Sequence, residues 1–285
     1  MKLKTIFKKI KYLRRIVAMQ PDIEQMSYMQ HYDFLQKHLY NNPKYQDDRK
    51  LNKYEFQVFS QSGEDGIIRE IFERIGVTNR TFVEFGVGNG LQNNTVNLLS
   101  QRWRGFWIDG SKDYVEFIQN KFKTFIDAGE LRLFHERITA EGIEAIFDSI
   151  GVPDEFDLLS IDIDGNDYWV WKAIKKYSPR VVVIEYNSAF PPPVKWVIKY
   201  RPEYVWDGTQ YFGASLKSME ALGAEKGYKL VGSTFSGINA FFVREDLVAD
   251  KFLEPFTAEN HYESPKYFVP KIYGHPKSVG PFMQI

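Results

Sequence analysis

Short apolar runs alternate with amphipathic stretches along the chain from about residue 55 onward. In one such stretch Ile67, Ile68, Ile71 and Phe72 recur at helical spacing, and Gly76 follows as a stop signal. Four alternations of strand and helix predict an α/β fold with a mostly parallel, doubly wound sheet. The predicted strands contain TFVEF (81–85), GFWID (105–109), LRLFHERI (131–138), FDLLSIDID (156–164) and RVVVIEYN (180–187), and the helices between them are 94–102, 112–128, 140–150 and 167–176.

The pattern changes after a long connection at 190–210. A helix at 213–228 precedes two strand-like runs, KLVGSTF and INAFFVRE, which are joined by Ser236-Gly237. Two such runs with a short Gly-containing link predict an antiparallel hairpin at the end of the sheet. We therefore divide the chain into an N-terminal helical extension (1–54), a nucleotide-binding domain (55–245) and a C-terminal extension (246–285).

In the N-terminal segment, apolar residues alternate with Lys and Arg. Leu3, Phe7, Ile10, Leu13 and Val17 recur at helical spacing, and residues 1–20 contain seven Lys and Arg and no acid. This pattern predicts a basic amphipathic helix, either attached to an anionic membrane face or packed on the body or on a second subunit. No internal repeat or low-complexity segment follows it.

Composition excludes several classes of protein. The chain has 285 residues, a net charge of zero and no cysteine. Disulfides, thiolate catalysis and cysteine zinc sites are excluded, and whole-chain charge gives no reason to expect nucleic acid. The basic N-terminus has neither the apolar region of a secretory signal nor a run that could span a bilayer. We expect a cytoplasmic protein, with peripheral contact at the inner membrane face and homo-oligomerisation as open alternatives.

The stretch TFVEFGVGNGLQNNT (81–95) places three glycines directly after a strand. Gly86, Gly88 and Gly90 follow a G-x-G-x-G pattern rather than the dinucleotide G-x-G-x-x-G, since Leu91 stands where the third glycine would be. Glu84 at the strand end suits a cationic ligand better than a pyrophosphate. Asp109 ends the next strand, where an acid can bind ribose hydroxyls. The combination favours S-adenosylmethionine over other nucleotides, although glycines here can also form a mere tight turn.

The run LLSIDIDGNDYWVWKAI (158–174) resembles the signature of the FkbM-type methyltransferases. Asp162, Asp164, Gly165 and Asp167 take the four places of the family run K-I-D-x-E-G-x-E, with both glutamates shortened to aspartate. The resemblance extends over roughly 55–245, and it is carried also by FSQSGEDGII, Asn94-Thr95, WRGFWID, VVVIEYN and GINAFFVR.

The resemblance implies a class I methyltransferase fold that binds S-adenosylmethionine and methylates hydroxyl oxygens of natural products or of sugars in surface glycans. By carry-over, the methionine end of the cofactor would contact Glu84 and the three glycines, and Asp109 would hold the ribose. Asn94 and Asp162 complete the predicted cofactor site, and Glu136 would flank the adenine. A non-sugar natural product, or a non-catalytic binding protein that kept the fold, remain alternatives.

Methyl transfer to a hydroxyl needs a base or a metal ion near the acceptor oxygen. Carboxylates follow two adjacent predicted strands, so we expect Asp162 and Asp164 to be catalytic, with His135 as another candidate base. Oxygen ligands from these strand ends suit Mg²⁺, and Asp162, Glu185 and Asn187 are the expected ligands. Alternatively, Asp164 and Asp167 cap the next helix and Glu185 is a structural acid. The aromatic-rich segment between Phe190 and Phe212 would form an acceptor lid, or pack under a long connection or in a dimer interface.

Overall fold

The protein is built around one seven-stranded sheet in the order β3-β2-β1-β4-β5-β7-β6. In the computed structural model, which describes residues 2–269 and 279, the pairings β1–β2, β2–β3, β1–β4 and β4–β5 are parallel, and β7 is antiparallel to both β5 and β6. This order, with β7 alone reversed among the described strands, confirms the predicted class I methyltransferase fold with its C-terminal hairpin. The strands are β1 Thr81–Phe85, β2 Arg104–Asp109, β3 Leu131–His135, β4 Glu155–Ile161, β5 Ser178–Glu185, β6 Tyr228–Ser233 and β7 Asn239–Arg244.

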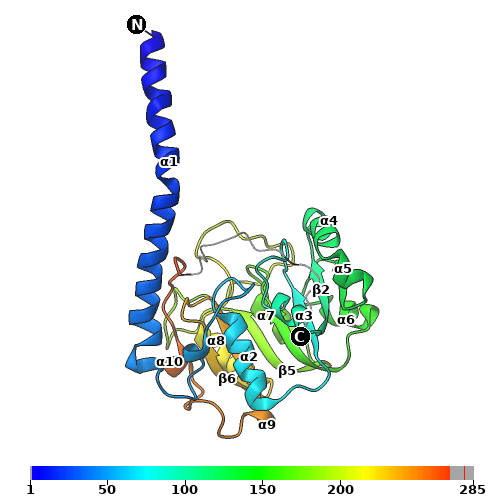
Figure 1. Ribbon diagram of the computed structural model, residues 1–285. Coiled ribbons are helices and arrows are strands. Elements are labelled where there is room, and N and C mark those ends of the chain that lie inside the picture. The colour runs from blue at the N-terminus through cyan, green and yellow to red at the C-terminus, as the bar shows by residue number, and fades with distance from the viewer. Residues whose placement is uncertain (1, 270–278, 280–285) are drawn as a thin grey trace.

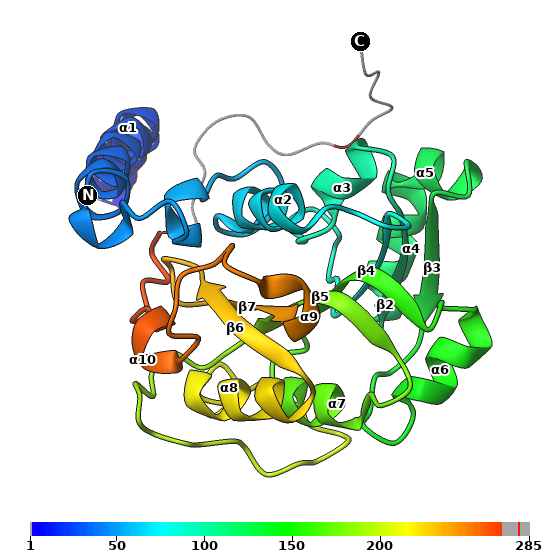
Figure 2. The same cartoon turned by 90° about the horizontal axis from the view of Figure 1, so that it is seen from below.

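Helices cover both faces of the sheet, as Figure 2 shows. The central strands are buried on both sides, which explains their nearly continuous apolar sequences. One face packs against α2 (Glu64–Ile75), α3 (Val96–Ser100), α4 (Lys112–Lys121) and α5 (Lys123–Asp127). The other packs against α6 (Ile143–Ile150), α7 (Asp167–Ala173) and α8 (Leu216–Glu225).

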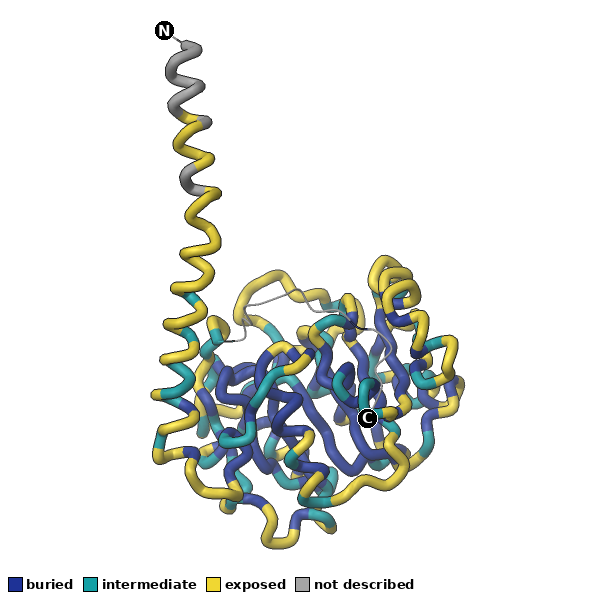
Figure 3. The backbone as a smooth tube through the Cα atoms, in the orientation of Figure 1, coloured by how far each residue is buried: buried dark blue, intermediate teal, exposed yellow. Residues whose placement is uncertain are grey.

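The first helix, α1 (Lys2–Leu35), projects from the body and is exposed over most of its length (Figures 1 and 3). Its last turn is anchored on the body: the Phe34 ring lies 6.1 Å from Phe235 and 5.4 Å from Phe268, measured between centroids. The chain then passes through η1 (Gln36–Tyr40), η2 (Pro43–Tyr45) and η3 (Leu51–Tyr54) before it reaches α2. No helix among the described residues is long and apolar enough to cross a bilayer.

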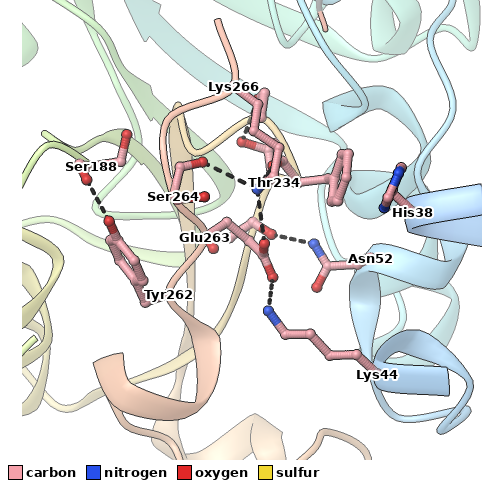
Figure 4. A network of polar contacts seen from close by, with 12 residues as sticks. His38, Lys44, Asn52, Ser188, Thr234, Tyr262, Glu263, Ser264 and Lys266 are labelled. Carbon is pink, nitrogen blue, oxygen red and sulfur yellow. Dashed lines mark hydrogen bonds and ion pairs between the residues drawn. The ribbon is translucent and has the colours of Figure 1, made fainter. Parts of the chain in front are cut away.

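The C-terminal part returns across the hairpin through α9 (Glu245–Val248) and α10 (Ala258–His261). Glu263 ties this return to the N-terminal extension, as Figure 4 shows: its carboxylate lies 2.6 Å from the Lys44 ammonium and 3.2 Å from that of Lys266. The Tyr45 hydroxyl also donates to Glu263, at 2.8 Å. The two extensions therefore hold each other against β6 and β7.

Candidate functional site

The three glycines of the turn after β1 have three different structural roles. A Cβ on Gly86 would lie 1.5 Å from the carbonyl oxygen of Asp162, so no other residue fits between the ends of β1 and β4. Gly88 also has positive φ but faces open space, and it lines a cavity. Gly90 packs on Phe122 and Trp107 in the core and does not line that cavity. Of the three glycines of this turn, Gly86 and Gly88 therefore line the cavity.

A cavity of about 400 Å³ lies at the carboxyl edge of the sheet. This volume is within the range of small-molecule and cofactor sites. Its wall comes from separate parts of the chain that meet at this edge: the glycine turn, the end of β2, the segment after β3, the loop after β4 and the connection after β5. The wall-forming residues include Gly88, Asp109, Tyr114, Ile138, Asp162 and Tyr204.

Asp109 lines this cavity and also holds the backbone of the glycine turn by a hydrogen bond. One carboxylate oxygen accepts a hydrogen bond from the Gly88 backbone N–H at 2.8 Å, and the other accepts from Ser111 N–H at 2.7 Å. The side chain is buried, with 7% of its surface exposed. Each carboxylate oxygen has a second lone pair, so Asp109 can hold the turn and still accept from a ligand hydroxyl.

Glu84 lies beneath the turn rather than in the cavity wall. Its carboxylate accepts from the Asn94 backbone N–H at 3.0 Å, from the Ser160 hydroxyl at 3.0 Å and from the Thr95 hydroxyl. Burial raises the pKa of this carboxyl, while the hydrogen bonds lower it. Glu84 and Asn94 therefore fix the loop that follows the glycines, and a contact between either side chain and a ligand stays a prediction.

Three carboxylates gather beside the cavity. Asp162, Asp164 and Glu185 each offer an oxygen atom, and these atoms lie within 4.8 Å of one another. Oε2 of Glu185 is buried and has no hydrogen-bond partner among the described residues. None of the three forms an ion pair with a Lys or Arg in the part of the chain that the structure describes. The group therefore has no neutralising partner among the described residues, and it has unused acceptor capacity.

The electrostatics of this group follow from its surroundings. Burial, and after it the neighbouring carboxylates, raises the pKa of both Asp162 and Glu185 well above the usual values. Partial burial raises the pKa of Asp164 as well. Ionisation of all three carboxyl groups is unfavourable because their negative charges would repel one another, so the group tends to hold a proton or to attract a cation. Both properties suit acid–base chemistry or metal binding.

Asp167 and Asn187 serve the loops around the group. Asp167 accepts from the backbone N–H groups of Ile163 and Gly165, each at 2.8 Å, and its pKa is raised to about 6, chiefly by burial. Asn187 donates to the carbonyl oxygens of Gln210 and Phe212, while its own side-chain oxygen accepts from Ala189 N–H. Asn187 was expected as a metal ligand; its polar atoms are committed to the loop, and Asp164 takes the third place in the carboxylate group.

His135 and Glu136 lie outside the cavity wall. His135 is exposed, and its Nε2 lies 3.2 Å from the carbonyl oxygen of Gly110. Glu136 is also exposed, and its backbone N–H donates to the carbonyl of Asp109. The next two residues, Arg137 and Ile138, line the cavity instead. The structure therefore does not bring His135 together with Asp162 and Asp164 in the wall.

The connection after β5 contributes part of the wall and packs elsewhere. Tyr204 and Trp206 line the cavity, and the Tyr204 ring lies so close to Gly165 that a Cβ there would approach it to 2.4 Å. Phe190 and Trp196 stack on each other with centroids 4.5 Å apart. The segment thus both lines the cavity and packs on itself, and its role as an acceptor lid stays a prediction. Sequence patterns alone missed Tyr114, Arg137, Asn166 and Tyr204 as wall residues, although the aromatic enrichment of 190–212 pointed to the last.

Comparison with known proteins gives structural neighbours only. No family model matches the chain, and no curated protein matches it. Among solved structures it is similar to an S-adenosylmethionine-dependent methyltransferase from Clostridium acetobutylicum (14% identity, 63% of this chain and 89% of that one, TM-score 0.40). It is also similar to the methyltransferase domain of bacterial CtHen1 (13%, 64% and 97%, TM-score 0.41) and to the pyocyanin biosynthetic protein PhzM (14%, 62% and 54%, TM-score 0.40). At these scores the assignment of the fold rests on the strand order of the sheet.

Proposed function

We propose that the protein is an S-adenosylmethionine-dependent O-methyltransferase of the FkbM type. The observation that carries this proposal is the meeting of three features at one cavity: a glycine turn with an open Gly88, the strand-end acid Asp109, and the carboxylate group Asp162–Asp164–Glu185. The first two suit a nucleoside, and the third suits the activation of an acceptor hydroxyl.

The residues present fit the cofactor. Gly88 leaves room for close approach to the backbone, and Asp109 retains acceptor capacity for the ribose hydroxyls. Ile108, Tyr114 and Ile138 give the wall an apolar part for a flat base. S-adenosylmethionine, when bound, supplies a methyl group activated by its sulfonium. The role of the chain is to hold that methyl group and the acceptor oxygen in line, which accounts for much of the rate in such displacements.

The carboxylate group would receive the proton of the acceptor hydroxyl. A carboxylate with a raised pKa is a stronger base than an ordinary one, and Oε2 of Glu185 has no internal donor to compete with an incoming hydroxyl. Asp162 lines the cavity and lies in the same group, so we assign Asp162 and Asp164 to the same proton acceptance. The geometry of the cavity wall does not support His135 as the base, because His135 does not line the cavity.

A divalent cation such as Mg²⁺ also fits this group. Three oxygen donors within 4.8 Å and one orphaned buried oxygen atom form a hard-ligand set that waters would complete. Asp162, Asp164 and Glu185 would hold the ion, and an acceptor hydroxyl bound to it would lose its proton more easily. Asn187 would orient the loop behind these ligands.

We propose a sugar hydroxyl of a surface glycan or glycosylated metabolite as the acceptor. The half-buried Tyr204 and the exposed Trp206 line the cavity, and aromatic rings suit the C–H faces of a sugar ring. A non-sugar natural product would use the same carboxylates. A binding protein without activity would keep the cavity but make no use of the carboxylate group.

The test is methyl transfer from labelled S-adenosylmethionine to a panel of monosaccharides, glycosides, phenols and carboxylic acids, with and without Mg²⁺. We expect transfer to carbohydrate hydroxyls. Transfer to phenols alone would overturn the sugar acceptor but not the enzyme class. Cofactor binding without transfer to any acceptor class would favour the binding protein.

A further inference from the structure

In the basic half of α1 (residues 2–20), the side chains that the structure describes are exposed and do not pack on the body. Within residues 9–20, all the side chains that the structure describes are exposed, and Leu13 and Val17 expose 59% and 66% of their surface. Figure 3 shows the helix projecting beyond the body, exposed along this stretch. Packing on the body, one of the alternatives raised by the sequence, is therefore excluded for the described side chains of this half.

The sequence of this half gives the helix two unlike sides. Positions 3, 6, 10, 13 and 17 are apolar and follow each other at intervals of three or four, so they share one side of an α-helix. Lys9, Lys11 and Arg14 lie between them and are exposed. The helix thus presents an apolar stripe bordered by basic residues.

Charge identifies the kind of surface that could cover this stripe. Residues 1–20 carry seven Lys and Arg and no acid, while the rest of the chain has the compensating charge of −7. Two copies of this half paired in parallel would place like charges side by side, which opposes self-association. An anionic lipid surface complements both features, because it attracts the basic residues and accepts the apolar stripe.

Pro21 marks the end of this half. Proline has no backbone N–H to donate to the carbonyl of Val17, so the helix is weakened at the point where the acid-free segment ends. The first acids, Asp22 and Glu24, follow directly. Beyond Pro21 the helix leads to its anchor at Phe34 on the body.

We propose that residues 2–20 bind the surface of an anionic lipid bilayer, with the apolar stripe in the headgroup region and Lys9, Lys11 and Arg14 against the lipid charges. The proposal does not depend on the methyltransferase activity. It describes a helix that lies on the surface of a membrane.

The experiment is flotation of the full-length protein with two kinds of vesicle, phosphatidylcholine alone and phosphatidylcholine with 30% phosphatidylserine. Three variants are compared with the parent: Lys9→Glu/Lys11→Glu on the basic side, Leu13→Glu/Val17→Glu on the apolar stripe, and Lys175→Glu/Lys251→Glu as a control. The control makes the same charge change at two exposed positions on the body. Circular dichroism and thermal unfolding verify that each variant folds.

We expect binding to the anionic vesicles at least tenfold stronger than to the neutral ones, and weaker binding in 0.5 M NaCl. Both α1 variants should lose at least tenfold in binding, and the control should bind like the parent. An equal loss of binding in the control would mean that binding depends on the net charge of the protein, and it would overturn the assignment to α1. Absence of binding to anionic vesicles would also overturn it.

A second copy of the chain is the competing occupant, since Tyr12, Met19, Ile23 and Met26 are exposed and recur at intervals of seven, four and three, as in a helix-pairing seam. Light scattering decides this. A dimer that persists in Lys9→Glu/Lys11→Glu, together with failure to float with anionic vesicles, would assign α1 to self-association instead of lipid.

Discussion

Carboxylates at two places along the same sheet edge have opposite surroundings. At the ends of β1 and β2, Glu84 and Asp109 accept hydrogen bonds on both oxygens from nearby backbone and hydroxyl groups. At the ends of β4 and β5, Asp162 and Glu185 stand next to other acids, and one oxygen of Glu185 has no partner among the described residues.

The difference shows how one edge of the sheet can combine two roles, holding the cofactor loop in shape and binding a proton or cation. Carboxylates that are satisfied internally hold a loop in a fixed shape, as a cofactor site requires. Burial of a carboxylate that lacks internal donors is energetically unfavourable. Such carboxylates are typically found at sites that transfer a proton or bind a cation. The following predictions test this division, beginning with the largest expected effect.

Glu185→Gln should remove most of the activity and leave cofactor binding intact. Glu185 lies outside the cavity wall, so its substitution should not disturb the cofactor. It removes a carboxylate that can accept a proton or hold a cation, so we expect kcat to fall by about 10² to 10⁴. Glu225→Gln, an exposed position at the end of α8, is the matched control and should be fully active. Full activity of Glu185→Gln would show that the β4–β5 carboxylates have no chemical role.

Gly86→Ala and Gly88→Ala should differ sharply in stability. The new methyl group at 86 would collide with the carbonyl of Asp162, so we expect a loss of about 3 kcal/mol or more in the free energy of unfolding. At 88 there is open space and only the positive φ is unfavourable, so about 1–2 kcal/mol is expected. Denaturant unfolding measures both, and equal losses would contradict the roles assigned to the two glycines.

Mg²⁺ should raise the melting temperature of the parent by a few degrees. For a millimolar dissociation constant, 10 mM ion adds about 1.4 kcal/mol to the free energy of unfolding. Asp164→Asn and Glu185→Gln should lose this shift, whereas Glu225→Gln should retain it. A shift that survives in both ligand variants would place the ion elsewhere.

Glu55 is a buried carboxyl outside the cavity and provides a reference for burial without a ligand. Burial raises its pKa to about 8, although Asn52 and the Phe235 backbone N–H donate to it. Because the folded pKa lies above the unfolded one, its contribution to stability is complete below about pH 4.5 and is lost as the pH rises through 8.

Glu55→Gln should therefore flatten the decline in stability between pH 5 and 8 by about 3 kcal/mol. Urea unfolding at several pH values measures it. His261, whose pKa is lowered to about 3 by burial, is present in both proteins and cancels in the difference. An unchanged decline in the variant would show that Glu55 ionises normally.

The sheet and the glycine turn could be predicted because they depend on local patterns. Alternating apolar runs and helical stripes determine the strands, and Gly86 with Gly88 follows β1 as expected. The helix expected at 112–128 is divided into α4 and α5 at Phe122, which packs in the core against Trp107. Such a break depends on tertiary packing and leaves no local signal.

The side-chain roles were less predictable because they depend on distant residues. Glu84 is turned inward by Ser160, which is 76 positions away, and Asn187 by Gln210 and Phe212. Arg137 and Ile138 line the cavity, rather than His135 and Glu136, because of where the segment after β3 meets the connection after β5. Residue type and strand position gave the correct edge of the sheet but not these contacts.

The most direct test of the central claim is calorimetric titration with S-adenosylhomocysteine of the parent, Asp109→Ala and Asp113→Ala. Asp113 is an exposed acid on α4, close to Asp109 in sequence, and serves as the matched control. Our account predicts micromolar binding by the parent and the control, and at least tenfold weaker binding by Asp109→Ala. Absence of binding by the parent, or binding that is unaffected by Asp109→Ala, would contradict it.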